Sequence, residues 1–456
     1  MRLVAKLPVR LRKLADAVRT SLWVRPLLLA IVGAALGIAL PLIDERGALF
    51  SEIDPDSPAW MFIKGTTGGA REVLGTAAAA LATIVAVAFS LAMLTVQLAS
   101  VHYSSRLLRR FMSDGIMQHV IGMYIGTIVY LLLVLRTIRG ESDEFEEVLP
   151  LASLMAGLVL TTVCLGLLPY FLHHVTRSVQ AATVVSRVSR ATIGGFRARA
   201  REHVVEGRLE DCPREAPLTV EANHSGYVQI IDVDELMDAL PRGVTFARVE
   251  VHVGDFVVPG MPLLSLWPPL PMSARVSKRL YRAFAIGHER TEEQDPLFGV
   301  RQLVDVALKA LSSGVNDVTT AMLVVNELTA ITAAVADTGR LGTGYRKRER
   351  DGVTVLLQEV GLVTYLQHAY GELPAAAKAH PRVLARIVES MSQVALTCRK
   401  DEVRRALLTP AEWALAASES EPMLPHERAL LTERWLVARD SVLDGRASHP
   451  PPSEIH

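Results

Sequence analysis

Residues 74–101 read LGTAAAALATIVAVAFSLAMLTVQLASV, and this stretch decides what kind of protein the chain is. It contains no Asp, Glu, Lys or Arg, and it is longer than the roughly 20 apolar residues that a helix needs to cross a bilayer core. Such a run must be helical in lipid, because a helix satisfies its own backbone hydrogen bonds there. The stretch therefore predicts a membrane-spanning helix.

Three further segments share this composition. They are residues 26–43, 116–135 and 148–172, and each lacks charged side chains. We interpret the first as an uncleaved anchor rather than a signal peptide, because its apolar run is long and no clear cleavage site follows it. The sequence predicts a mainly α membrane protein, in which a four-helix transmembrane bundle over residues 26–172 precedes a cytosolic α+β region.

The charges that flank these segments alternate in sign. Residues 1–25, the loop around Arg106 and residues 173–201 are basic, whereas the loops over residues 44–73 and 136–147 are mixed or acidic. Basic flanks stay on the cytoplasmic side of a membrane. We therefore expect a multi-pass protein of the inner membrane with its N-terminus and its C-terminal domain in the cytoplasm.

Glycines in two of the segments have the spacing of close helix packing. Gly33 and Gly37 form one Gly-x-x-x-Gly pattern, and Gly122 and Gly126 form another. Small residues at this spacing let the backbones of two membrane helices approach each other. We expect these four glycines to lie at helix contacts.

Polar residues of the second segment recur every seven positions, at Thr76, Thr83, Ser90 and Gln97. This spacing keeps them on one helix face, with a drift of about 20° per heptad. Two interpretations remain open: a seam that bonds to neighbouring helices, or a stripe that lines a pore. We favour the packing seam, because hydroxyl and small residues are common at membrane-helix contacts.

A basic stretch follows the fourth segment, over residues 173–215. It reads as a juxtamembrane helix and linker, with an interruption at Gly194-Gly195. Its arginines are Arg177, Arg187, Arg190, Arg197, Arg199 and Arg201. They are expected to anchor this side in the cytoplasm, and binding of anionic lipids is the alternative.

Short β-branched runs separated by glycines predict a small β subdomain over residues 216–271. Apolar spacing then predicts a helical subdomain over residues 272–445, followed by a disordered tail over 446–456. Helices are expected at residues 277–286, 297–311, 318–336, 353–371, 381–400 and 426–443, and a solvated loop at 337–351.

The stretch from Val251 to Leu263 resembles the second half of a biotinyl/lipoyl-type barrel-sandwich hybrid, with tight turns at Gly254-Asp255 and Gly260. Residues 216–271 contain no lysine to correspond to the modified residue of such carriers. The resemblance therefore implies a fold and no covalent cofactor.

Five stretches resemble the bacterial membrane proteins of domain-of-unknown-function family 2254. They are residues 96–100 (VQLAS), 105–108 (SRLL), 226–229 (GYVQ), 287–295 (GHERTEEQD) and 310–321 (ALSSGVNDVTTA). The chain differs at Ser313 and Val318, where the family usually has proline. The resemblance implies a four-span bacterial membrane protein with a cytosolic domain, and it brings no established activity.

The last two stretches are dense in chemically useful side chains. The candidate ligand or structural cluster is His288, Arg290, Asp295, Asn316 and Asp317. These residues meet no standard spacing for a metal site, a nucleophile or a phosphate-binding loop. We therefore expect no enzyme activity, no cofactor and no metal, and we favour helix capping as their role.

Two functions remain open at this point. One is a homo-oligomeric pore or channel-like protein controlled by its cytosolic domain, motivated by the polar stripe, the glycines and the lack of buried charge. The other is a membrane-anchored regulatory module that binds a ligand or a protein. The lipid bilayer is the expected partner in both cases, and no nucleic-acid partner is expected.

Overall fold

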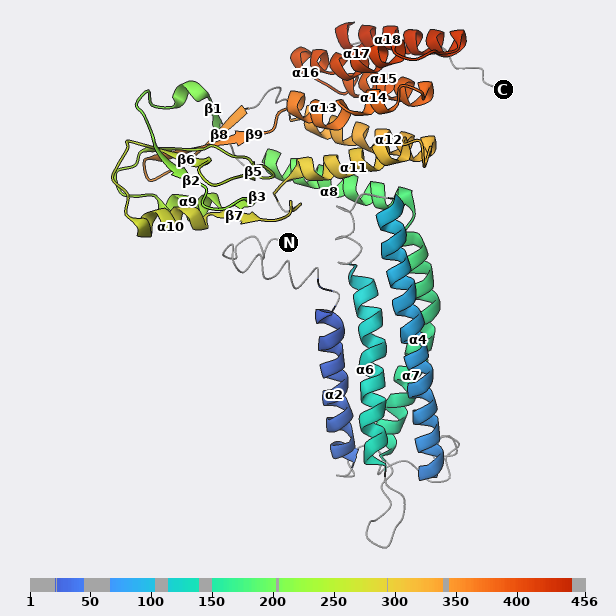
Figure 1. The fold of residues 1–456 in the computed structure, drawn as a ribbon. Coiled ribbons are helices and arrows are strands. Elements are labelled where there is room, and N and C mark those ends of the chain that lie inside the picture. Colours follow the sequence, from blue (N-terminus) through green and yellow to red (C-terminus); the bar gives the residue numbers. More distant parts are fainter. Residues whose placement is uncertain are drawn as a thin grey trace. The chain divides into compact units, whose positions relative to one another are not determined.

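The structure, a computed structural model, describes residues 21, 23–44, 66–102, 114–138, 150–201, 205–292, 294–338 and 344–444. The chain divides into two compact units close to residue 180 (Figure 1). We call them the N-terminal unit, which holds the first four helices of the described part, and the C-terminal unit, whose main part begins at Ala181. Most of the basic N-terminus and the predicted disordered tail over residues 446–456 lie outside the described residues.

The N-terminal unit consists of long apolar helices in its described part. They are α2 (Val24–Asp44), α4 (Thr67–His102), α6 (Gly115–Thr137) and α7 (Leu151–Ser178). The helices α2, α4 and α6 contain the first three predicted spans, and α7 contains residues 151–172 of the fourth, so the structure has an apolar helix at each predicted span. Tyr124, Tyr130 and Leu131 of α6 are fully buried, because α6 packs against both α2 and α7.

A polar clasp joins three of these helices at one end. The Asp44 carboxylate, at the end of α2, accepts hydrogen bonds from the backbone N–H of Ala152 and from the N–H and hydroxyl of Ser153, at the start of α7. The Tyr130 hydroxyl of α6 donates to the Ser153 carbonyl oxygen at 2.7 Å. Asp44 thus satisfies first-turn amides of α7 that have no partner within their own helix.

The C-terminal unit contains two sheets. The six-stranded sheet has the order β1 (Val205–Gly207), β8 (Gly344–Arg350), β9 (Val353–Glu359), β4 (Phe246–Val249), β6 (Pro262–Trp267) and β2 (Leu218–Glu221). The three-stranded sheet has the order β5 (Phe256–Val257), β3 (Gly226–Ile231) and β7 (Phe284–Gly287). Neighbouring strands are antiparallel, except that β4 and β9 are parallel.

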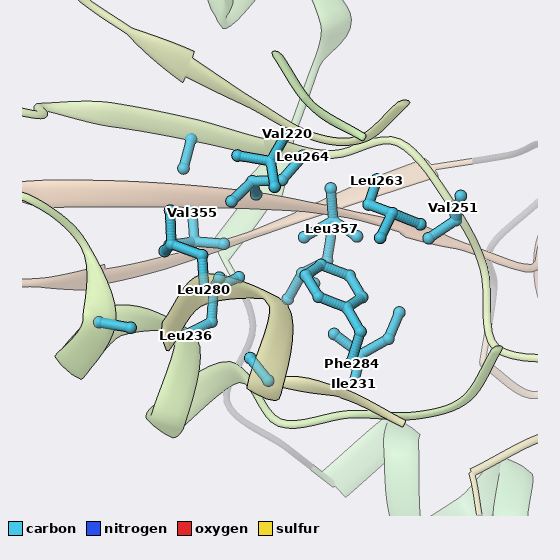
Figure 2. Close-up of a cluster of buried hydrophobic side chains, with 14 of the residues drawn as sticks. Val220, Ile231, Leu236, Val251, Leu263, Leu264, Leu280, Phe284, Val355 and Leu357 are labelled. Carbon is cyan, nitrogen blue, oxygen red and sulfur yellow. The ribbon is translucent and has the colours of Figure 1, made fainter. Parts of the chain in front are cut away.

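The core of this part lies between the sheets and two helices, α9 (Val233–Ala239) and α10 (Ala274–Arg282). Figure 2 shows Val355 and Leu357 of β9 facing Leu236 of α9, Leu280 of α10 and Phe284 of β7. Leu357 and Phe284 are about 95% buried and the other three completely so. Burying such side chains stabilises a fold by about 1.5–3 kcal/mol each.

Two elements differ from the sequence-based expectation. Residues 277–286 are not one helix, since α10 ends at Arg282 and β7 follows it. Residues 353–371 form strand β9 and then helix α13 (Leu362–Tyr370). The helix prediction failed here because short apolar runs fit a buried strand as well as a helix.

The predicted loop over residues 337–351 also contains a strand. Its residues 344–350 form β8, while residues 339–343 lie outside the described part. β8 turns into β9 through Asp351 and Gly352, whose φ angles are +52° and +77°. This left-handed pair suits a tight hairpin. The six-stranded sheet therefore takes two strands from beyond residue 271.

Helices make up the rest of the C-terminal unit. They are α8 (Ala181–Arg201), α11 (Pro296–Ala310), α12 (Val318–Ala336), α14 (Leu373–Ala376), α15 (Pro381–Ala395), α16 (Asp401–Ala406), α17 (Leu408–Glu419) and α18 (Pro425–Asp444), with a short 3-10 turn at Leu209–Asp211. The expected interruption at Gly194-Gly195 is wrong, because α8 runs through both glycines.

Five of the described helices are long and apolar enough to cross a membrane. Four are those of the N-terminal unit, and the fifth is α12. Length and composition alone do not separate α12 from the others. Its packing does differ, because α12 lies against α8, α11 and α15 of the C-terminal unit.

Candidate functional site

The predicted glycine contacts join α2 to α6. A Cβ atom added to Gly33 would lie 2.1 Å from the carbonyl oxygen of Gly126, and one added to Gly126 would lie 2.6 Å from the carbonyl oxygen of Leu29. One added to Gly122 would lie 2.6 Å from a Leu29 methyl group, and one added to Gly37 would lie 2.9 Å from Leu133 Cβ. The two Gly-x-x-x-Gly patterns thus allow a backbone approach that any larger residue would block.

The polar residues of α4 lie on a different kind of surface. Thr76, Thr83, Ser90 and Gln97 are all exposed. The opposite face of α4 is buried in its own bundle, through Leu74, Ala78, Leu81, Ala88 and Ala92. The polar residues therefore point away from the helices of the same chain. We call this exposed set the α4 polar stripe.

The hydroxyls of the α4 polar stripe bond to their own helix. Thr83 donates to the Ala79 carbonyl oxygen at 3.1 Å, and Ser90 donates to the Ala86 carbonyl oxygen at 2.9 Å. The predicted bonds from these two hydroxyls to neighbouring helices are thus absent among the described residues. Such local bonding lets a hydroxyl lie at membrane depth without a partner from another helix.

The loop after β7 contains a buried ion pair. Arg290 donates from Nε and Nη2 to Asp295 Oδ2, at 2.9 and 2.6 Å. Asp295 is 3% exposed, and its Oδ1 accepts from the Phe298 backbone N–H at 3.1 Å, so it caps α11. Burial raises the pKa of Asp295, although the Arg290 charge opposes this shift. Capping, the predicted role of Asp295, is what the geometry shows.

A second loop closes over this ion pair. Gly254 has φ +103°, and a Cβ atom there would lie 2.3 Å from Asp295 Oδ2 and 2.7 Å from Arg290 Nη2. Beside it, burial alone would raise the pKa of Asp255, but hydrogen bonds and charge from His252, with the Arg290 charge, lower the pKa overall. The turn predicted at Gly254-Asp255 therefore packs against the Arg290–Asp295 ion pair.

Amide side chains fix the same loop to its surroundings. Gln229 of β3 donates to the Glu289 carbonyl oxygen at 2.7 Å, and the Ile231 N–H donates to Gln294 Oε1 at 3.0 Å. Arg199 of α8 donates to the Gln294 carbonyl oxygen. The loop over residues 287–295 thus links the three-stranded sheet to α8 and α11. Its polar groups serve structural contacts, and His288 itself is exposed.

The other half of the predicted cluster lies elsewhere. Asp317 caps α12 by accepting from the Thr320 N–H at 3.0 Å, and hydrogen bonds from the Thr320 hydroxyl and from this N–H lower the pKa of Asp317. Asn316 precedes it in a left-handed conformation with φ +49°. The 15 residues of α11 separate Asp295 from this turn, which is a rise of roughly 22 Å. The five predicted residues therefore do not converge on one site.

Sequence reasoning missed a second clasp in the N-terminal unit. Asp114 Oδ1 accepts from the Ile116 N–H at 3.0 Å and caps α6, while its Oδ2 lies 2.8 Å from Nε2 of His174 on α7. A capping Asp before an apolar run was the available signal. Within the described residues, no group of three or more His, Cys, Asp or Glu side chains could hold a metal ion.

Comparison with known proteins gives consistent matches over most of the chain. The family described as "Predicted membrane protein (DUF2254)" matches residues 19–393. An uncharacterized protein of Mycobacterium bovis is 31% identical over 453 residues, which cover 97% of this chain and 85% of that protein. An uncharacterized protein of Mycobacterium tuberculosis matches with the same identity and coverage. No solved structure matches the chain, and none of the matches supports a barrel-sandwich hybrid.

Proposed function

We propose that this chain, which belongs to this family of predicted membrane proteins as its sequence motifs indicated, is a homo-oligomeric pore of the bacterial inner membrane. Helices α2, α4, α6 and α7 cross the bilayer, and the N-terminus and the C-terminal unit lie in the cytoplasm. The alternation of basic and acidic flanks supports this orientation. Reporter fusions after Arg139 and after Glu202 test it, and a periplasmic reporter after Glu202 would contradict it.

The surroundings of α12 support four spans rather than five. Thr329 of α12 donates to the Ser390 hydroxyl of α15 at 2.7 Å, and Arg386 of α15 donates to Asn326 at 2.6 Å. Thr332 lies 3.1 and 3.0 Å from the buried hydroxyls of Tyr365 and Tyr370. A helix held by these polar partners belongs to the core of the C-terminal unit.

The observation that carries the pore proposal is the direction of the α4 polar stripe. In a single chain it would face lipid, where an amide such as that of Gln97 gains from a partner on another helix. A packing seam, the interpretation that the sequence favoured, is not formed with helices of the same chain, because the residues of the stripe are exposed. In an oligomer, the α4 helices of several copies would face one another and line a water-filled path.

The alternative of a membrane-anchored binding module rested on the cluster around residues 288–317. That cluster is divided between the two ends of α11, and Arg290, Asp295 and Asp317 are occupied by capping and pairing. We therefore prefer the pore.

Single-channel recording of the purified protein in planar bilayers tests the proposal. We expect Ser90→Leu and Gln97→Leu to abolish or strongly reduce the conductance, because each replaces a polar group of the path by a bulky apolar one. Thr162→Leu is the matched control, since Thr162 is an exposed hydroxyl on α7 that bonds to its own helix in the same way. Absence of conductance in the unsubstituted protein, or equal effects of all three changes, would refute the pore.

A further inference from the structure

Helix α8 carries three exposed arginines on one side. Arg187, Arg190 and Arg197 are exposed, and helical geometry places the three within an arc of about 80°. Residues 181–201 contain no Asp or Glu. Among the described residues, none of the three arginines forms an ion pair. We call these residues the α8 arginine stripe.

The opposite face of α8 is already occupied. Val185 and Val188 are buried, the Phe196 ring packs edge-on against Tyr365 with centroids 5.8 Å apart, and Thr192 lies against Gly299 of α11. An amphipathic helix that enters a membrane needs a free apolar face. Because α8 has no free apolar face, its charged side is the part that can contact a membrane surface.

Arg199 does not belong to the stripe, although the sequence groups it with the other arginines. It donates to the Gln294 carbonyl oxygen and is therefore committed to the fold of the C-terminal unit. Arg190 donates to the Ser186 carbonyl oxygen of its own helix, and it has no carboxylate partner among the described residues.

Chain connectivity limits how far the start of α8 can lie from the end of α7. Helix α7 has 28 residues, which correspond to roughly 42 Å, whereas the hydrocarbon core is about 30 Å thick. The end of α7 at Ser178 thus extends into the headgroup region when α7 spans the bilayer. Only Val179 and Gln180 separate it from α8, and three peptide steps reach at most about 11 Å.

We propose that the α8 arginine stripe binds the phosphate groups of anionic phospholipids. The inference relies on α7 crossing the membrane, as proposed above, but not on the existence of a pore. Unpaired guanidinium groups suit phosphate, which they contact through two parallel hydrogen bonds. Since α8 has no apolar face to insert, the binding is electrostatic and weakens as salt screens it.

The test is native mass spectrometry of the full-length protein titrated with phosphatidylglycerol. We expect the triple variant R187Q/R190Q/R197Q to bind this lipid roughly 100-fold more weakly, because each cation near an anionic surface contributes a factor of several. Its matched control is R242Q/R275Q/K278Q, which removes three exposed cations of the C-terminal unit that form no ion pair among the described residues. The control should bind like the unsubstituted protein.

Several results would overturn the proposal. They are equal affinity of the two triple variants, equal binding of phosphatidylcholine and phosphatidylglycerol, and binding unaffected by raising salt from about 0.1 M to 1 M. Displacement of the lipid by millimolar inorganic phosphate would indicate a site for free anions instead. Hydrogen exchange in nanodiscs supplies a second readout, in which residues 181–198 should be more protected with phosphatidylglycerol than with phosphatidylcholine. None of these measurements depends on conductance, so a result that contradicts lipid binding can be distinguished from one that contradicts the pore proposal.

Discussion

Replacing Gly33 by alanine tests the α2–α6 contact directly. The new methyl group would lie 2.1, 2.7 and 2.9 Å from the carbonyl oxygen, carbonyl carbon and Cα of Gly126. These are backbone atoms, so no rotamer change can remove the clash. Ordinary contact begins at 3.4 Å, and the 2.1 Å contact requires the two helices to move apart by up to 1.3 Å.

The energetic cost follows from that displacement. A gap of 0.5–1 Å already loses about a quarter to a half of a dispersion contact, and overpacking typically costs about 1–3 kcal/mol. Alanine is favoured over glycine in a helix by up to about 1 kcal/mol, which offsets part of the cost. We expect Gly33→Ala to lower the free energy of unfolding by about 1–2 kcal/mol net.

Thermal unfolding of the detergent-solubilised protein, followed by circular dichroism, measures this effect. Gly166→Ala is the control, because Gly166 lies on α7 with no atom within 4 Å of an added Cβ. It should leave the protein as stable or more stable. If Gly33→Ala is also neutral, or if both variants lose the same stability, the proposed contact between the two glycine patterns is wrong.

Three further predictions concern single residues. Asp317→Ala should lower the free energy of unfolding by about 1 kcal/mol and Asp317→Asn should lower it little, because both Asp and Asn cap helices. Since hydrogen bonds lower the pKa of Asp317, the stabilisation that its carboxylate gives should be full above about pH 4 and should be lost as the pH falls through the lowered folded-state pKa. Chemical unfolding at several pH values measures this dependence. Gly254→Ala should destabilise the protein more than Gly260→Ala, because both have positive φ but only Gly254 contacts Asp295 and Arg290; equal melting temperatures would contradict this. Asp44→Ala should cost about 1–2 kcal/mol by leaving the first amides of α7 unpaired, and hydrogen exchange at residues 152–153 should rise; unchanged exchange would show that the clasp is not formed.

The sequence alone predicted the elements that are determined by residues close together in the chain. The four apolar helices of the N-terminal unit followed from composition, because lipid leaves the backbone few alternatives. Caps such as Asp295 and Asp317 followed from their position before apolar runs. The strand β8 did not, since its sequence GYRKRER has no apolar alternation, and it is a strand because β1 and β9 pair with it on both sides.

The sequence pattern did not show which residues far apart in the chain contact each other. The spacing of Gly33 and Gly126 indicated close packing, but not that one would lie against the other. The seven-residue spacing predicted that the α4 polar stripe lies on one helix face, but such a spacing does not predict what that face contacts. The same holds for the cluster at residues 288–317, because two caps close in sequence lie at opposite ends of a helix.

The apolar character of α12 has a consequence during synthesis. A translocation machinery that reads hydropathy as the chain emerges would meet α12 as a fifth candidate for insertion. The cations of β8 begin ten residues after the end of α12, and such charges resist export across a membrane; they are Arg346, Lys347, Arg348 and Arg350. On the proposed orientation, the charges that made β8 look like a loop would oppose insertion of α12 and so favour its folding with the helices of the C-terminal unit.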